Sequence, residues 1–333
     1  MRAVVLTGHG SFDALKVEER PDPQPGQGEV RVDVRAAGVN FADHMARMGL
    51  YPDAPKPPCV VGYEVSGTVD AVGPGVEGVA EGDRVMAGTR FNGYAEKVVV
   101  NAGNVAALPE RLTFEQGAAI PVNYSTAWTA LLGYGSLRRG ERVLIHAAAG
   151  GVGIAATQIA RREGAYILGT ASPGKHDRIR EFGVDEPLDY TREGWERDVE
   201  PVDLVLDAVG GASFRRSYGL LRAGGRLVAF GASSVASGDK RNLLKAAPQA
   251  LRMVRGFNLI DQMSASKAVI GLNLLSLWDD RGTLEPWLTP LRELLDDGTI
   301  QPVVSDVVPF DNAGEAHRIL AERRNVGKVV LVP

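Results

Sequence analysis

The residues best suited to chemistry in this sequence are the glycines of AAAGGVG, residues 147–153. The motif follows an apolar run that ends at Ile145 and precedes a helix-like run at 154–160. A dinucleotide site requires this strand–turn–helix order, because glycines let the backbone approach a pyrophosphate and the helix N-terminus offers free N–H groups. Ala148 replaces the first glycine of G-x-G-x-x-G, so a tight turn without a ligand is the alternative. We interpret the motif as a dinucleotide site formed by Ala149, Gly150, Gly151, Val152 and Gly153.

The segment GTASPGK at 169–175 indicates which dinucleotide is bound. An NAD site places an acidic residue about 20 residues past the glycine motif, where it holds the ribose 2′-hydroxyl. Here Ser172 and Lys175 are present instead, and they suit a 2′-phosphate, so the sequence predicts NADP(H). The alternative is that Lys175 is an ordinary solvated loop lysine. The segment nearly matches a phosphate-binding loop, but His176 stands where Ser or Thr would hold magnesium, so we exclude nucleoside triphosphate hydrolysis.

Candidate metal ligands are few and scattered. The sequence has one cysteine, Cys59, and its five histidines show no paired spacing. A single cysteine excludes an internal disulfide framework and a four-cysteine zinc site, and it fits a reducing compartment. Since a catalytic zinc needs three protein ligands, we predict no bound metal, and we expect a cytoplasmic protein.

The elements that position these residues fall into three regions of the 333-residue chain, a length typical of about two domains. Residues 1–122 consist of strands and turns. Residues 123–263 alternate short apolar runs with helical stretches, which predicts βαβ units, a parallel sheet and an α/β fold. Residues 264–333 contain two helical stretches and a closing strand, at 284–296, 312–322 and 328–332.

The charge of the chain excludes several classes of partner. Lys and Arg total 37 and Asp and Glu total 41, and the formal net charge of −4 gives no general attraction to nucleic acid or anionic lipid. Residues 143–160 lack formal charge, but their glycines and alanines indicate a buried strand, turn and helix rather than a membrane span. Residues 238–255 are basic and amphipathic and could meet lipid or an acidic partner. The net charge and Pro248 favour a solvated flap beside the cofactor cleft instead.

Several stretches together resemble the medium-chain dehydrogenase/reductase superfamily. They are GVNFAD at 38–43, the glycine- and valine-rich stretch at 62–73, GDRV at 82–85 and the turn at 147–153. Within the superfamily the chain is similar to the zinc-independent quinone oxidoreductases. Four further stretches resemble the vesicle amine transport protein-like branch of this family, at 40–47, 171–176, 240–243 and 325–333. The resemblance implies a GroES-like β-rich catalytic domain at 1–122, a doubly wound parallel-sheet Rossmann domain at 123–263, and a segment, 264–333, that returns to the catalytic domain.

The resemblance also implies that the catalytic residues are Asn40, Tyr51 and Tyr63, with Asp43 beside the cofactor. Zinc-containing members carry a cysteine where Asn40 stands and a histidine where Tyr63 stands, and neither replacement is a usable zinc ligand. Each residue has a structural alternative. Asn40 could hold a loop through backbone hydrogen bonds, Tyr51 could pack in a turn, and Asp43 could cap the following helix.

Further contacts with NADP(H) are implied by position in the same family. Thr126 would face the nicotinamide amide, and Tyr190 would lie where the adenosine phosphate can be reached. Ordinary sheet core is the alternative for Phe257 and Leu259. The other implied contacts are Phe230, Gly231, Ala232, Asn258, Asn325 and Lys328.

The expected activity is NADPH-dependent hydride transfer to a quinone or an α,β-unsaturated carbonyl compound. Without a metal, such a reaction needs only positioning and a donor near the developing oxyanion. The alternative is an NADP(H)-binding protein with little turnover that acts through a partner or a membrane surface. An open edge strand expected at 256–260 predicts a homodimer formed by edge-to-edge pairing. Alternatively, the 238–255 flap covers that edge and leaves a monomer.

Overall fold

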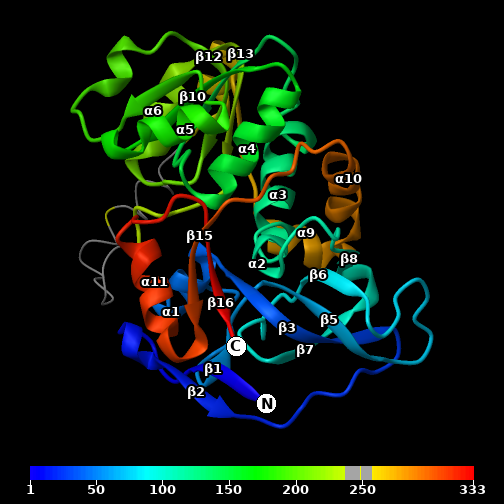
Figure 1. Ribbon diagram of the computed structural model, residues 1–333. Helices are drawn as coiled ribbons and strands as arrows, with labels where there is room; N and C mark the ends of the chain where they lie inside the picture. Colours follow the sequence, from blue (N-terminus) through cyan, green and yellow to red (C-terminus); the bar gives the residue numbers. More distant parts are fainter. Residues whose placement is uncertain (237–247, 249–256) are drawn as a thin grey trace.

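Two halves, each built on its own main β-sheet, make up the molecule (Figure 1). Residues of both halves line a cleft. The computed structural model describes residues 1–236, 248 and 257–333. Nearly all of the basic stretch 238–255, predicted to be a flap, lies outside these residues. In the part of the chain that is described, no helix is long and apolar enough to cross a membrane.

One half, formed by residues from the middle of the chain, contains a six-stranded parallel sheet with the strand order β11-β10-β9-β12-β13-β14. After Arg142, its central strand β9 consists of buried aliphatic side chains, none of residues 143–145 being more than 1% exposed. Because both faces of a parallel sheet must be covered, helices connect the strands. The strands are β9 (Arg142–Ile145), β10 (Tyr166–Ala171), β11 (Glu186–Asp189), β12 (Val202–Asp207), β13 (Leu221–Ala229) and β14 (Ala268–Gly271). The helices are α4 (Gly151–Arg162), α5 (His176–Phe182), α6 (Ala212–Leu220) and α8 (Leu259–Ala265), with short 3-10 turns at Pro173–Lys175 and Trp195–Asp198.

The edge of this sheet differs from the prediction. The edge strand is β14, and Leu259 and Ile260, predicted to lie in that strand, begin helix α8. Asn258 is the N-cap of α8 and its side chain accepts a hydrogen bond from the Asp261 backbone N–H at 2.8 Å. An Asn cap with an acidic residue in the first turn favours a helix over a strand. The parallel sheet therefore extends beyond position 263, into the segment that we predicted to return to the catalytic domain.

The second half is a mainly antiparallel sheet of seven strands in the order β15-β16-β3-β5-β6-β8, with β7 also pairing with β3. A smaller sheet has the order β2-β1-β4. Alternate residues of β3 face the core, since Val30, Val32 and Val34 are at most 2% exposed. The strands are β1 (Arg2–Leu6), β2 (Leu15–Glu19), β3 (Glu29–Val39), β4 (Cys59–Val60), β5 (Glu64–Val72), β6 (Arg84–Gly88), β7 (Lys97–Asn101), β8 (Val105–Ala107), β15 (Val304–Pro309) and β16 (Lys328–Val332).

The strand β16 brings the end of the chain back among the N-terminal strands, red among blue in Figure 1. It pairs antiparallel with β3, with Val329 opposite Val39. Just before it, the Gly327 N–H donates to the Ala149 carbonyl at 2.9 Å, so the glycine turn of one half is held against the other. The remaining helices are α1 (Phe41–Arg47), α2 (Phe114–Gly117), α3 (Pro121–Trp128), α9 (Leu274–Arg281), α10 (Glu285–Asp296) and α11 (Ala313–Ala321), with a π-helical turn at Thr129–Gly133 and 3-10 turns at Phe12–Ala14, Ala102–Asn104 and Phe310–Asn312.

Candidate functional site

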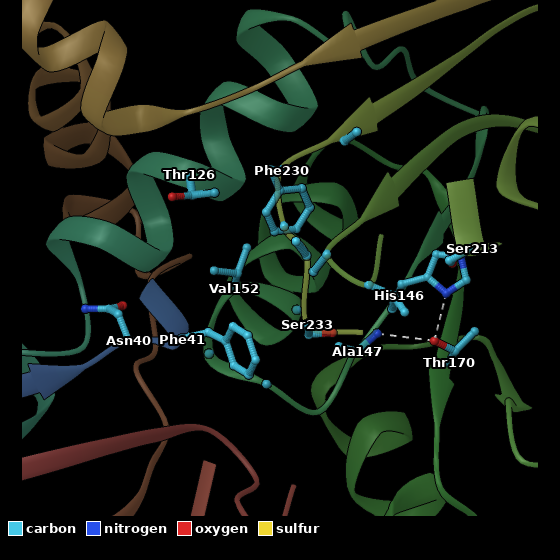
Figure 2. Close-up of a pocket in the computed structure, with 18 of the residues that line it drawn as sticks. Asn40, Phe41, Thr126, His146, Ala147, Val152, Thr170, Ser213, Phe230 and Ser233 are labelled. Atoms are coloured by element: carbon cyan, nitrogen blue, oxygen red, sulfur yellow. Dashed lines mark hydrogen bonds between the residues drawn. The ribbon is translucent and has the colours of Figure 1, made fainter. Parts of the chain in front are cut away.

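A cleft of about 1340 Å³ lies at the carboxyl ends of the parallel strands, where an open α/β sheet binds its ligands. In Figure 2 Asn40 and Thr126 lie toward one end of it and His146 and Thr170 toward the other, with Val152 between them. Residues from both halves line it. We refer to the end next to α1 and α3 as the substrate end, and to the end next to β10 and β12 as the adenosine end, after the ligand that the sequence predicts.

The glycine turn between β9 and α4 fits an anion. Gly150 is the N-cap of α4 and supplies no side chain, so the first N–H groups of the helix have no capping partner there. A Cβ on Gly153 would lie 2.3 Å from the Ala147 carbonyl oxygen, so only glycine permits the close contact of helix and turn. The open N–H groups and the positive end of the helix dipole suit a pyrophosphate.

Two basic side chains lie on the wall of the adenosine end. Lys175 Nζ donates to the carbonyl oxygens of Arg323 and Asn325, both at 2.7 Å, which leaves one of its three protons for a ligand. Burial lowers the pKa of Lys175, and the Arg323 guanidinium adds to the shift. That guanidinium lies 5.8 Å from the centre of the Tyr190 ring. Ser172 lines the same wall, so a hydroxyl and two cations are available for a phosphate.

A buried ion pair forms part of the wall at the substrate end. Lys328 Nζ donates to Glu64 Oε1 at 2.5 Å and to Asn40 Oδ1 at 2.7 Å. Asn40 Nδ2 donates to the same Glu64 oxygen at 3.0 Å, and the Val122 N–H donates to Glu64 Oε2 at 2.7 Å. Glu64 is fully buried and Lys328 is 3% exposed. Both ends of the Asn40 amide are therefore occupied, and Asn40 serves to hold this wall together.

Asp43, predicted to contact the cofactor, does not line the cleft. It is fully buried at the start of α1, where its carboxylate accepts the N–H of Asn40 at 2.8 Å, the N–H of Gly62 at 2.9 Å and the hydroxyl of Tyr94 at 3.0 Å. Burial raises the pKa of Asp43 to about 7. The helix-capping alternative describes its position, and Asp43 fixes the backbone at Asn40 and next to Tyr63.

Two tyrosines lie at the substrate end, surrounded by apolar side chains. The Tyr51 and Tyr63 rings meet edge to face with centres 6.2 Å apart, and Phe91 packs on Tyr63 at 5.1 Å. The Tyr63 hydroxyl is buried and faces the Tyr51 hydroxyl, without a close hydrogen bond among the described residues. Burial raises the pKa of Tyr51 to about 12 and the pKa of Tyr63 further still, with the Asp43 charge adding to the latter. Both phenols are protonated at neutral pH and can donate a hydrogen bond.

Most of the predicted site residues line the cleft, and the exceptions besides Asp43 are Phe257, Asn258 and Leu259. Phe257 contacts the Tyr218 ring at 5.2 Å, Asn258 caps α8 and Leu259 is 70% exposed. Residues 271–273, at the end of the edge strand and just after it, line the cleft in their place. The lining includes Asn40, Tyr51, Tyr63, Thr126, Ala149, Gly150, Gly151, Val152, Gly153, Ser172, Lys175, Tyr190, Phe230, Gly231, Ala232, Asn325 and Lys328.

Three contributors were missed by the sequence analysis. Glu64 is next to Tyr63 in the stretch at 62–73. A carboxylate among apolar strand residues indicates a buried partner, and Lys328 is that partner. Arg323 and residues 271–273 carry no comparable signal, because only the packing of distant elements brings them to the cleft.

Known proteins match this chain in sequence and in structure. Residues 26–110 match the family described as the alcohol dehydrogenase GroES-like domain, and residues 182–331 match the zinc-binding dehydrogenase family. The chain is 39% identical to the synaptic vesicle membrane protein VAT-1 homolog of Rattus norvegicus, over 100% of this chain and 84% of that protein. The Escherichia coli quinone oxidoreductase complexed with NADPH superposes with a TM-score of 0.85 and 29% identity, covering 100% of both chains. The CurK enoyl reductase gives a TM-score of 0.85 and 26% identity, covering 99% of this chain and 98% of that one.

Proposed function

Because the chain belongs to the medium-chain dehydrogenase/reductase superfamily of oxidoreductases, in the branch of the VAT-1 homologues, we propose that it is a zinc-independent NADPH-dependent reductase of quinones or α,β-unsaturated carbonyl compounds. The observation that carries the proposal is the pair of protonated phenols, Tyr51 and Tyr63, that face each other in the lining of the cleft. The solved structures of a quinone oxidoreductase with NADPH and of an enoyl reductase support both the cofactor and the acceptor class.

The lining of the cleft fits NADPH along its length. The N–H groups at the start of α4 would hold the pyrophosphate, and Ser172, Lys175 and Arg323 would surround the 2′-phosphate. Thr126 lies toward the opposite end, where the nicotinamide would lie (Figure 2). The cofactor, when bound, supplies a hydride to the acceptor.

The protein's own part in the reaction is to bind the acceptor, exclude water and stabilise the negative charge that hydride addition places on a carbonyl oxygen. The Tyr63 and Tyr51 phenols are the neutral donors available at that end, and a donor aimed at developing charge acts most strongly in a water-poor site. One hydride and one proton complete the two-electron reduction, and the proton comes from solvent through the phenols. Asn40 acts by position, because its amide is already engaged.

Zinc chemistry does not fit these residues, although one matching family is described as zinc-binding. A catalytic zinc needs three ligands drawn from Cys, His and carboxylate. The described residues contain no group of three His, Cys, Asp or Glu side chains arranged to hold a metal ion. Asn40 is committed to Glu64 and Lys328, and Tyr63 is a neutral phenol.

The proposed function is tested by steady-state NADPH oxidation with a panel of quinones and enones. We expect turnover with at least one acceptor and a preference for NADPH over NADH. Tight NADPH binding with no turnover on any acceptor would favour the alternative, a cofactor-binding protein that acts through a partner or a membrane surface. The exposed apolar side chains of α8, with Leu259, Ile260 and Met263 between 70% and 75% exposed, are the feature that such a role would use.

We further propose a homodimer in which two copies pair through the β14 edge of the parallel sheet. The strand is last in the sheet order, and the exposed apolar residues of α8 precede it directly in sequence. A two-fold contact would cover both the open strand and the apolar helix face. Light scattering at micromolar concentration decides the matter, since a mass near 35.5 kDa would exclude the dimer.

A further inference from the structure

A buried histidine that no predicted role accounts for lies at the adenosine end of the cleft. His146 follows β9 directly, lines the cleft and is only 5% exposed. Its Nδ1 lies 3.2 Å from the Thr170 hydroxyl, and its Nε2 lies 3.0 Å from the Ser217 hydroxyl. Figure 2 shows the Thr170 hydroxyl between the imidazole and the Ala147 backbone, with both contacts dashed. The Trp195 ring packs edge to face on the imidazole at 5.9 Å.

The hydrogen bonds beyond Ser217 determine where the protons lie. The Ser217 hydroxyl donates to Asp207 Oδ2 at 2.6 Å, and a carboxylate can only accept. Ser217 has a single proton, so it accepts from His146, and Nε2 carries the hydrogen. Nδ1 is then the unprotonated nitrogen and accepts from the Thr170 hydroxyl, whose oxygen in turn accepts the Ala147 N–H at 3.2 Å. One arrangement, with a neutral imidazole, satisfies every group in the chain.

This chain of hydrogen bonds joins the ends of three neighbouring strands. Ala147 begins the glycine turn after β9, Thr170 lies in β10 two residues before Ser172, and Asp207 ends β12. Asp207 also accepts the N–H groups of Val209 at 2.8 Å and Gly210 at 3.2 Å, which fixes the loop after β12. Ala147, Thr170 and Val209 all line the cleft. The imidazole therefore connects the pyrophosphate turn with both walls of the adenosine end.

We propose that neutral His146 is a positioning residue for the adenosine half of the dinucleotide, so that removing or protonating its imidazole weakens cofactor binding. This inference depends on the proposed NADP(H) binding. A proton on Nδ1 would turn the acceptor facing Thr170 into a donor, so the Thr170 hydroxyl would lose its acceptor and its proton would have to turn away from the ring. The charged groups facing the ring are the Asp207 carboxylate and the Arg216 guanidinium of α6. Burial lowers the pKa of His146, the carboxylate opposes this shift and the guanidinium adds to it.

The test compares NADP⁺ affinity, measured by calorimetry between about pH 5 and about pH 7.5, in the wild type and in His146→Gln. The glutamine amide can still donate toward Ser217 but has no ring nitrogen facing Thr170. Loss of one buried hydrogen bond predicts roughly tenfold weaker binding at neutral pH. The 2′-phosphate itself titrates with a pKa of about 6, so both proteins lose some affinity in acid. The wild type should lose more, and the ratio of the two dissociation constants should shrink as pH falls.

Three further measurements separate positioning from simple structural support. Thr170→Val keeps the side-chain shape but removes the hydroxyl, and it should reproduce the affinity loss even if His146→Gln fails to fold. His317→Gln, at a buried histidine that does not line the cleft, should lower thermal stability while leaving NADP⁺ affinity unchanged. Nitrogen-15 spectra of the wild type without cofactor should show a protonated Nε2 and an unprotonated Nδ1.

The outcomes distinguish this inference from the proposed function. If the wild type fails to bind NADP⁺, the proposed function fails. If the wild type binds it, but His146→Gln and Thr170→Val bind equally well with the same pH dependence, then His146 merely stabilises the fold and the inference is wrong.

Discussion

The two ends of the cleft differ in which polar groups keep a hydrogen-bond donor free for a ligand. At the substrate end, Asn40, Glu64 and Lys328 satisfy one another, whereas the Tyr63 hydroxyl faces the Tyr51 phenol without a close hydrogen bond among the described residues. At the adenosine end, the start of α4 and the Lys175 ammonium keep donors in reserve. Groups whose hydrogen-bonding capacity is fully used hold the walls of the cleft together. Groups with an unused hydrogen-bond donor are available to bind a ligand. The comparison predicts which substitutions change stability and which change binding or turnover.

The largest effect is expected where a saturated group is broken. Lys328→Met leaves the Glu64 carboxylate buried without its counter-ion, which should lower the free energy of unfolding by about 3–5 kcal/mol. Denaturant unfolding measures it. The double variant Glu64→Leu with Lys328→Met removes both charges and should regain most of the loss. Equal destabilisation of the single and double variants would contradict a role for the ion pair itself.

The free hydroxyl should give the opposite result. Tyr63→Phe removes a donor for the developing oxyanion and should lower kcat/KM about 100-fold. Because that hydroxyl is buried without a close hydrogen bond among the described residues, its removal should leave the free energy of unfolding nearly unchanged. Tyr51→Phe is the matched comparison at the neighbouring phenol. If Tyr63→Phe were destabilised and fully active, the hydroxyl would have a structural role, like Asn40, Glu64 and Lys328, and no role in turnover.

A substitution in the glycine turn tests the adenosine end through steric fit, without changing any charge or hydrogen-bonding side chain. Gly153→Ala places a Cβ 2.3 Å from the Ala147 carbonyl oxygen and should reduce stability by about 1–3 kcal/mol and weaken cofactor binding. Gly174→Ala is the control, since a Cβ there meets nothing within 4 Å. Thermal unfolding and fluorescence titration with NADPH report the two effects. Similar losses in both variants would show that the turn has no special requirement.

The smallest effect is expected at the walls with cations. Ser172→Asp with Lys175→Ala replaces a hydroxyl and a cation by a carboxylate, which should shift the preference from NADPH toward NADH by about tenfold or more. Titration of both cofactors gives the ratio. Arg323→Ala, which leaves Ser172 and Lys175 in place, should weaken NADPH binding without favouring NADH. Equal affinity of the wild type for the two cofactors would refute the predicted preference.

Local patterns predicted the fold well and the site unevenly. The glycine motif and the buried strands predicted the parallel sheet because the signals lie within one strand–turn–helix unit. The edge strand was wrong because residues 256–260 are apolar enough for either structure, and the cap at Asn258 decides for a helix. Asp43 was assigned to the cofactor by resemblance, whereas its three hydrogen bonds direct it into the core. Glu64 and Lys328 could not be paired from spacing, because 264 residues separate them.

During ribosomal synthesis the parallel sheet can be completed before the antiparallel sheet, because the antiparallel sheet needs strands from both ends of the chain. Asn40 and Lys328, joined by one hydrogen bond, are 288 residues apart, whereas all six parallel strands lie between positions 142 and 271. The parallel half can therefore complete its sheet while residues 37–39 of β3 still lack β16. At about 5–20 residues per second, synthesis from Asn40 to Lys328 takes roughly a quarter of a minute to a minute. During that time residues 37–39 of β3 present an open edge to solvent or to a chaperone, so a strand made early is among the last to be protected from aggregation.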